Sequence, residues 1–344
     1  MNNLKMKYDK LTKIKFMKYF KTITDVMEGI LFGVGKVTRG APHILDNLEI
    51  KRYMSIAIIA LLPTAAASIY FFGVKAVLII LVSYAAGGFV EVLNAIIRKK
   101  EIEEGFLVTG LIFPLILPPT VPLWVVAVGV MFGTLFGKEI FGGTGRNIFN
   151  PALVGRLFVT IAFPEIMTTA FIAPFTDAVT SATPLVLFKT TQAVTPSLSL
   201  LLGTSAGSMG EIFRIGIILG GLFLMFTRVS NWRIPISYIG TVFVFAVIGN
   251  SFLPSRFAPP LFQILTGGLL FGAMFMATDP VTSPYTNTGK VIFGILTGVF
   301  TVLIRTFSGY TEGVMFSIVL MNGFAPLIDQ MIITIKYRPG KNER

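Results

Sequence analysis

Apolar segments long enough to cross, or nearly cross, a hydrocarbon core of about 30 Å recur along the whole chain. The chain is 53% hydrophobic and only 13% charged, which is outside the range of ordinary soluble domains. The sequence therefore predicts an all-α polytopic membrane protein with about ten transmembrane helices. The predicted segments are roughly residues 53–72, 76–97, 105–117, 121–140, 148–170, 211–227, 235–253, 260–277, 289–306 and 313–335.

Several of these segments begin or end in Gly and Pro. The third ends in LPPTVP, the sixth follows GTSAGSMGE, and the eighth ends in ATDP. Lipid cannot satisfy the backbone groups that such breaks set free. These ends therefore predict broken or half-length helices that face protein or a cavity.

The distribution of Lys and Arg predicts the orientation in the membrane. Residues 1–52 carry eleven Lys and Arg against five acids, and no small-residue cleavage site follows a short apolar run, so they are interpreted as a basic cytoplasmic arm rather than a signal peptide. Connecting segments on that side bring its total to 23, whereas the other side has only Lys75, Lys189 and Arg256. We therefore expect both termini, including the tail 336–344, in the cytoplasm and the loop 171–208 outside. The net charge of +12 follows from this topology, and no nucleic acid partner is predicted.

The two halves, 53–170 and 209–335, resemble each other. TGLIFPLILPP at 109–119 is similar to TGGLLFGAMFMATDP at 266–280, and FGG at 141–143 is similar to FSG at 307–309. Five segments in each half predict two five-helix repeats inserted with opposite orientation. Ligand sites in such folds form at the repeat interface near broken helices. Chance similarity between Gly-rich membrane helices is the alternative explanation.

The composition excludes several metal centres. Cysteine is absent, which excludes thiolate zinc sites, Cys-ligated iron–sulfur clusters and disulfides from this chain. A single histidine, His43, excludes bis-histidine haem. No metal cofactor is predicted, so electrons passing through this chain would need an organic cofactor or a partner subunit.

Two polar segments on the predicted cytoplasmic face hold candidate ligand groups. GKEIFGGTGRNIFNPALVGR, 137–156, puts glycines and polar side chains at a helix start, which suits an anionic or carbonyl-rich ligand; it is not a Walker A motif. MATDPVTSPYTNTGK, 276–290, concentrates groups able to bond a heteroaromatic ring or a hard cation such as Na⁺. A tight interhelical turn and a solvated loop are the respective alternatives. The candidates are Gly143, Thr144, Arg146, Asn147, Asn150, Thr278, Asp279 and Thr282.

Three arginines, Arg156, Arg214 and Arg305, lie in or near apolar segments. Charge inside a membrane usually has a partner or an anionic ligand, whereas a long side chain near a helix end snorkels to the surface. The sequence leaves both interpretations open for each arginine.

The predicted outer loop contains a hydroxyl-rich run, FTDAVTSATPLVLF, at 175–188. A Ser- and Thr-rich loop is by itself typical of a solvated linker. The run from Asp177 to Thr183 nevertheless resembles the flavinylation motif D-x-x-[S/T]-[G/S]-A-T. In that motif the last threonine receives FMN through a phosphoester bond, installed by a flavin transferase.

Further motifs extend this resemblance over most of the chain. GAPHILDNLEIKR, GKEIFGGTGRNIFNPALVGR, GSMGE, WRIP, FMATDPV, NTGK and APLID occur in order from about residue 36 to 330. They resemble the NqrB/RnfD family, the membrane subunits of the sodium-translocating NADH:quinone oxidoreductase (NqrB) and of the Rnf complex (RnfD). HILDNLEIKR, GKEIFGGTGRN and NTGK with APLID are closer to NqrB. The 344-residue length and the proline in SATPL are closer to RnfD.

The resemblance implies specific roles for the outer loop. Covalent FMN is expected on Thr183, with Asp177, Thr180, Ser181 and Ala182 recognised by the flavin transferase. Riboflavin is expected between the two polar cytoplasmic segments. Membership of the NqrB branch would also imply quinone near Gly110.

The resemblance also implies a place in a larger assembly. We expect a translocase-type oxidoreductase subunit in the bacterial cytoplasmic membrane that relays electrons between flavins. Its complex would couple NADH:quinone or ferredoxin:NAD⁺ oxidoreduction to export of Na⁺ or H⁺, with iron–sulfur clusters on neighbouring subunits. A channel or facilitator for a small solute and a purely structural membrane anchor are the competing interpretations, since inverted repeats with broken helices also serve transport.

Overall fold

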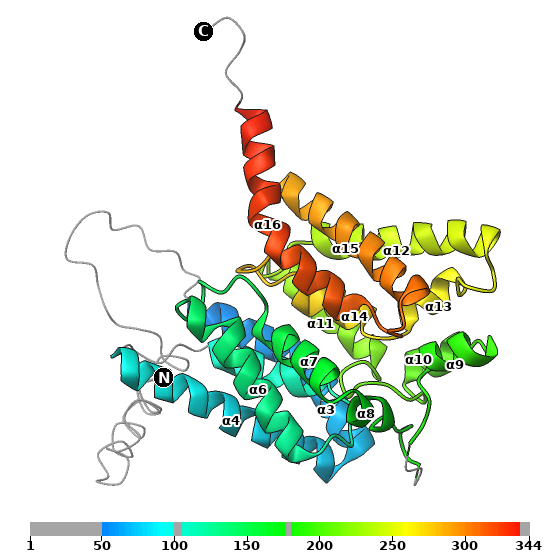
Figure 1. Cartoon of the computed structure of the whole chain (residues 1–344), viewed down its shortest axis with the longest axis horizontal. Helices are drawn as coiled ribbons and strands as arrows, with labels where there is room; N and C mark the ends of the chain where they lie inside the picture. The colour runs from blue at the N-terminus through cyan, green and yellow to red at the C-terminus, as the bar shows by residue number, and fades with distance from the viewer. Residues whose placement is uncertain (1–49, 100–104, 177–179, 338–344) are drawn as a thin grey trace, which may run out of the picture.

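The computed structural model describes residues 50–99, 105–176 and 180–337 (Figure 1). No strand is present in these three ranges, which agrees with the all-α prediction. Most of the basic arm 1–52, the tail beyond residue 337, and Asp177 lie outside the described residues.

The first half contains five principal helices and two short ones. The apolar composition of the predicted segments explains where they form. They are α3 (Ile50–Phe72), α4 (Val74–Arg98), α5 (Gly105–Leu115), α6 (Leu123–Gly137), the 3₁₀ turn η2 (Glu139–Phe141), α7 (Pro151–Ala162) and α8 (Pro164–Thr169).

Two short helices of the predicted outer loop, α9 (Pro184–Thr191) and α10 (Ser197–Leu202), connect the halves. The second half then contains four long or medium helices and one broken element. These are α11 (Arg214–Phe226), α12 (Arg233–Phe252), the broken element α13 (Pro260–Leu265), α14 (Leu269–Phe271) and η3 (Gly272–Met276), α15 (Asn287–Phe307) and α16 (Val314–Lys336).

Six helices in the described part of the chain are long and apolar enough to cross a membrane: α3, α4, α6 together with η2, α12, α15 and α16. The prediction of a polytopic α-helical membrane protein is therefore confirmed. Ten full crossings are not shown, because the other four predicted segments form shorter or interrupted helices. Segment 148–170 divides into α7 and α8, and segment 260–277 divides at Gly267, whose φ of +62° is left-handed.

Large apolar side chains are exposed on the long helices. Phe89, Phe226 and Phe252 are 61%, 87% and 79% exposed. A soluble protein rarely leaves so much contiguous apolar surface in water. This surface is the one that lipid would cover.

Helix packing follows one scheme in both halves. In the first half α4 packs on α6 and α6 on α7; in the second α12 packs on α15 and α15 on α16. Two helix pairs pack against each other across the halves, α3 with α11 and α7 with α16. In Figure 1 α12, α15 and α16 form a group above α3, α4 and α6.

Glycines allow α6 and α7 to touch through their backbones. A Cβ atom on Gly133 would lie 2.4 Å from the carbonyl oxygen of Pro151, and one on Gly155 would lie 2.5 Å from that of Gly129. No side chain fits at either position without moving a helix. This contact fixes the start of α7, where Asn150 lies, and the middle of α7, where Arg156 lies.

Candidate functional site

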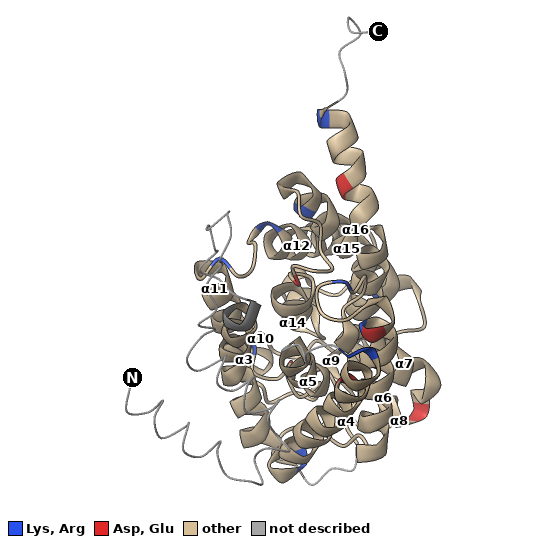
Figure 2. Cartoon of the chain, turned by 90° about the vertical axis from the view of Figure 1, so that its left-hand side faces the viewer, with Lys and Arg blue, Asp and Glu red and all other residues tan. Residues whose placement is uncertain are grey.

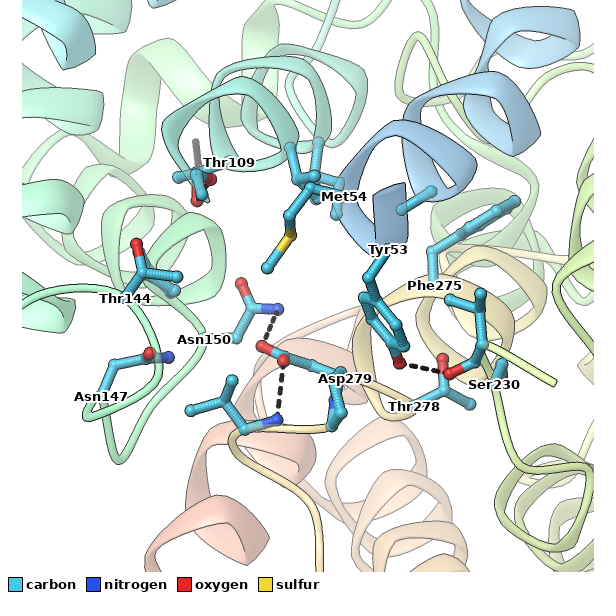
Figure 3. Close-up of a pocket in the computed structure, with 18 of the residues that line it drawn as sticks. Tyr53, Met54, Thr109, Thr144, Asn147, Asn150, Ser230, Phe275, Thr278 and Asp279 are labelled. Carbon is cyan, nitrogen blue, oxygen red and sulfur yellow. Dashed lines mark hydrogen bonds between the residues drawn. The ribbon is translucent and has the colours of Figure 1, made fainter. Parts of the chain in front are cut away.

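A pocket lies where the broken ends of the two halves meet; we call it the Asp279 pocket (Figure 3). Its empty volume is about 710 Å³, counting space open to solvent. It combines polar groups with apolar walls. Its polar lining comprises Tyr53, Thr109, Lys138, Thr144, Asn147, Asn150, Ser230, Thr278 and Asp279, and its apolar lining includes Met54, Ile112 and Phe275.

Asn150 joins one wall of this pocket to the other. Its Oδ1 accepts hydrogen bonds from the backbone N–H groups of Ala152 and Leu153, at 3.1 and 3.4 Å, and so caps α7. Its Nδ2 donates to Oδ2 of Asp279 at 3.4 Å (Figure 3). Asn150 and Pro151 thus supply a helix start within segment 137–156, as predicted, because proline is favoured at the first helical position.

Asp279 lies in the loop between η3 and α15. Besides Asn150, it accepts a hydrogen bond from the backbone N–H of Val281 at 3.1 Å. Burial raises the pKa of the Asp279 carboxyl to about 6. The carboxyl can therefore change its charge near neutral pH, which an ordinary exposed aspartate does not.

Asp329 of α16 holds the loop that carries Asp279. The carboxylate of Asp329 accepts hydrogen bonds from the backbone N–H groups of Tyr285 and Thr286, at 2.8 and 3.1 Å, and from the hydroxyl of Thr286. Thr286 in turn caps α15. Asp329 thus holds the loop in place and does not itself line the pocket.

A buried ion pair closes the side of the pocket near α4. Lys138 follows α6 and bonds Glu91 of α4, and the two residues are 2% and 5% exposed. Burial makes such a pair sensitive to the loss of either member. Sequence reasoning missed this pair, because each residue alone is an ordinary charge near a helix end.

Only some of the candidate residues from the two predicted polar segments, 137–156 and 276–290, lie together in one pocket. Thr144, Asn147, Asn150, Thr278 and Asp279 line the Asp279 pocket. The remaining candidates do not. Arg146 is exposed, Gly143 is a positive-φ turn residue, and Thr282 is buried outside the lining.

Gly110 also lies outside the lining of the Asp279 pocket. A Cβ atom there would lie 2.7 Å from the ring of Tyr84, so Gly110 is a packing contact between α5 and α4. Its carbonyl accepts a hydrogen bond from the hydroxyl of Ser83 at 3.0 Å. The implied quinone site stays a prediction.

Sequence reasoning missed the walls that α3 and the loop before α12 contribute. Tyr53 of α3 donates its hydroxyl to the carbonyl of Val229, beside Ser230 (Figure 3). Neither segment carries a polar motif, so no local sequence pattern predicts this contact.

A second pocket opens at the predicted outer loop; we call it the Thr183 pocket. Thr180, Ser181, Ala182 and Thr183 all line it. Its empty volume is about 1590 Å³, again counting space open to solvent. The backbone N–H of Ser181 donates to the carbonyl of Phe171 at 2.7 Å, which holds the run against the pocket rim.

Thr183 is the N-cap of α9. Its Oγ1 accepts a hydrogen bond from the backbone N–H of Val186 at 3.4 Å, and Pro184 occupies the first helical position. The hydroxyl therefore lies at the positive end of a helix dipole, where an attached phosphate would be favoured.

Buried charges lie beneath the Thr183 pocket, and Figure 2 shows coloured segments gathered near α7 and α9 on an otherwise mostly tan ribbon. Glu211, which precedes α11, and Glu312, which precedes α16, both line the pocket. A Cβ atom on Gly268 would lie 2.9 Å from Oε1 of each carboxylate, so the two converge at the break before α14. The carboxylate of Glu312 accepts a hydrogen bond from the backbone N–H of Gly268.

The three intramembrane arginines gather at the same place. All are at least 95% buried, which excludes snorkelling. Arg214 donates to the carbonyls of Leu265 and Leu200, and Arg305 donates to those of Gln263 and Thr266. These two arginines therefore neutralise the carbonyl end of α13.

Comparison with known proteins identifies the fold's relatives. The model of the NQR2, RnfD, RnfE family matches residues 37–338. The B subunit of a Na(+)-translocating NADH-quinone reductase from Klebsiella pneumoniae (strain 342) is 34% identical, with 95% of each chain covered. Proteins of the same name from Pseudomonas paraeruginosa (strain DSM 24068 / PA7) and Ectopseudomonas mendocina (strain ymp) are 36% and 43% identical, over 92% and 76% of this chain and 93% and 68% of theirs. The chain therefore belongs to the NQR2, RnfD, RnfE family.

Proposed function

We propose that this chain is the flavin-carrying membrane subunit of a sodium-translocating NADH:quinone oxidoreductase complex. The observation that carries the proposal is the position of Thr183, the last residue of the flavinylation-like run, as the cap of α9 at the rim of a large pocket. The named relatives above all belong to NADH-quinone reductases, which favours the NqrB branch over RnfD of the Rnf complex.

The Thr183 pocket fits an FMN attached to Thr183. The α9 N-terminus would hold the phosphate of the ester, as described above. Aromatic rings of Phe171, Tyr310 and Phe316 line the pocket, and those of Tyr310 and Phe316 are 4.7 Å apart between centroids. Such rings offer flat apolar walls for a flavin ring. A flavin transferase would recognise the run from Asp177 to Ala182.

The Asp279 pocket is the proposed site of riboflavin. The oxygen and amide groups of Asn147, Asn150 and Thr278 suit the polar edge of an isoalloxazine ring, and Met54 and Phe275 suit its apolar face. The two flavins would then lie in separate pockets, one on each side of the helical core. Bound flavins supply the electron transfer, and the chain supplies their positions and surroundings.

We further propose that the ten apolar segments form two inverted repeats with cytoplasmic termini. Two features support the repeats: the packing scheme is the same in both halves, and the helices that cross between them, α3 with α11 and α7 with α16, are counterparts. In such repeats ligand sites lie at the interface near broken helices. Both pockets occupy such positions.

The partners follow from the same proposal. Neighbouring subunits would carry the iron–sulfur clusters that a chain without cysteine cannot hold. Na⁺ would be the exported ion, with H⁺ as the alternative, and quinone would be the final electron acceptor of the complex.

A modification experiment tests the proposal. The chain is produced in a host that supplies its complex and the flavin transferase, and flavin is read as in-gel fluorescence and by peptide mass spectrometry. We expect FMN on Thr183 in the unmodified chain, none in Thr183→Ala, and full attachment in the matched variant Thr190→Ala, which removes an exposed threonine of α9 outside the recognised run. A colourless purified complex would favour the facilitator interpretation instead, and FMN on another residue of Thr183→Ala would refute the assignment of Thr183.

A further inference from the structure

Arg156 of α7 differs from the other two buried arginines. Its Nε and Nη1 are buried and have no hydrogen-bond partner. Arg214 donates through Nε and Nη1, and Arg305 donates through Nη1 and Nη2, to carbonyls around α13, so that only Nε of Arg305 is left without a partner. No carboxylate oxygen of the described residues lies within 4.0 Å of its guanidinium nitrogens. Arg156 is only 5% exposed.

Arg156 cannot easily move to find a partner elsewhere. The preceding residue, Gly155, presses on the backbone of Gly129, which fixes this turn of α7. Arg156 lines the Thr183 pocket together with Thr183 itself. Arg156 therefore belongs to the wall of that pocket.

Among the described residues, the charges around Arg156 do not balance. Arg156 and Arg305 each lie within electrostatic reach of both Glu211 and Glu312, and Arg214 lies near Glu211. In the part of the chain that the structure describes, three guanidinium groups thus face two carboxylates. A buried charge without a partner is costly, so the arrangement calls for one more negative group in the pocket.

We propose that Arg156 faces the flavin ring of the FMN on Thr183 and raises the reduction potential of that ring. This inference rests on the proposed function. The N-terminus of α9 would hold the phosphate of the ester. The buried guanidinium of Arg156 is therefore free to interact with the flavin ring. Arg156 would compensate the negative charge that an electron brings to the ring when no proton accompanies it. That electron comes from the preceding carrier of the complex and leaves for the next.

The test is a redox titration of the purified complex with the variant Arg156→Gln. The contribution of this FMN is identified as the component that Thr183→Ala lacks. Attachment to Thr183 is confirmed first, by mass spectrometry. We expect a midpoint potential lower than in the unmodified complex, by roughly a tenfold change in the ratio of oxidised to reduced flavin, or about 59 mV for a one-electron couple.

Two further variants make the sign of the effect decisive. Burial raises the pKa of the Glu211 carboxyl, so this titration is run at pH 9, where the carboxyl is charged. Glu211→Gln then removes a negative charge from the same pocket at constant shape, so the potential should rise. Arg256→Gln removes an exposed arginine from the loop before α13, and the potential should stay unchanged. If Arg156→Gln does not assemble, Glu211→Gln still decides the question, because an unchanged or lowered potential there refutes the proposal.

The remaining outcomes separate this inference from the proposed function. Absence of FMN from the unmodified chain would overturn both. Full attachment with an unchanged potential in Arg156→Gln would overturn only the role of Arg156. Reduced attachment with an unchanged potential would mean that Arg156 meets the phosphate, and this too would overturn its role toward the ring.

Discussion

At the scale of single residues, the polar side chains of the Asp279 pocket have two tasks at once. Asn150 caps α7 and also bonds Asp279 across the pocket, and Asp329 holds the loop on which Asp279 lies. A pocket built in this way changes shape when one of its own ligand-facing residues is altered. Binding and stability are therefore expected to change together.

The variant Asn150→Ala tests this coupling. It removes the cap of α7 and the link to Asp279, so we expect a loss of about 1 kcal/mol in the free energy of unfolding and weaker retention of riboflavin. Thermal unfolding in detergent, with the flavin content measured on the same sample, checks both. Unchanged stability with lost flavin would mean that the cap contributes nothing to the fold.

The matched variant Asn150→Asp keeps a capping oxygen but places a carboxylate against Asp279. Because the pKa of Asp279 is raised to about 6, this carboxyl is mostly neutral at pH 5 and charged at pH 8. Repulsion therefore arises only at the higher pH. We expect the stability deficit of Asn150→Asp to be larger at pH 8 than at pH 5. The deficit of Asn150→Ala should rise less over this range, because that variant loses a donor to the charged carboxyl but adds no repulsion. An equal deficit of Asn150→Asp at the two pH values would contradict this account.

At the scale of elements, the sequence is most informative about long apolar helices and least about how the short ones meet. Hydropathy predicts α3, α4, α6, α12, α15 and α16 because length and apolar content are local properties. The glycines and prolines around residues 118 and 267 predict breaks in the helices there. Tyr53 lines the Asp279 pocket because α3 packs on α11. Arg156 has buried nitrogens without hydrogen-bond partners because of how the surrounding helices pack. No local sequence pattern predicts either feature.

The contact between α6 and α7 is the element-scale feature that both pockets depend on. A methyl group on Gly133 would collide with the carbonyl of Pro151, at the start of α7. We expect Gly133→Ala to lower the free energy of unfolding by about 1–3 kcal/mol, because overpacking forces the helices apart. Thermal unfolding of the purified protein measures this loss.

Gly240 of α12 supplies the control. A methyl group there meets no atom within 4 Å, so Gly240→Ala should be neutral or slightly stabilising, as alanine favours helix. Equal losses in the two variants would show that the effect is one of helix propensity and that the α6–α7 contact is not limiting.

At the scale of the whole molecule, contacts between distant loops agree with the orientation predicted from charge. Asn150 with Asp279 joins loops predicted to be cytoplasmic. Thr120 with the carbonyl of Ala170, and Lys189 with that of Tyr310, join loops predicted to be external. Side-by-side loops must lie on one side of a membrane. The contacts thus agree with the predicted grouping of the loops into two sides, and the assignment of one side to the cytoplasm stays a prediction from charge.

Accessibility of single cysteines tests this assignment, and the absence of native cysteine removes any background. Thr191, at the end of α9, and Tyr337, after α16, are both exposed. In intact cells a membrane-impermeant maleimide should label Thr191→Cys but not Tyr337→Cys. Tyr337→Cys should react only after the membrane is opened. The reverse pattern would place Thr183 and its pocket in the cytoplasm, so that FMN attachment there would require a cytoplasmic transferase. Labelling of both in intact cells would mean that the two positions share the outer face, which α16 as a crossing helix does not allow.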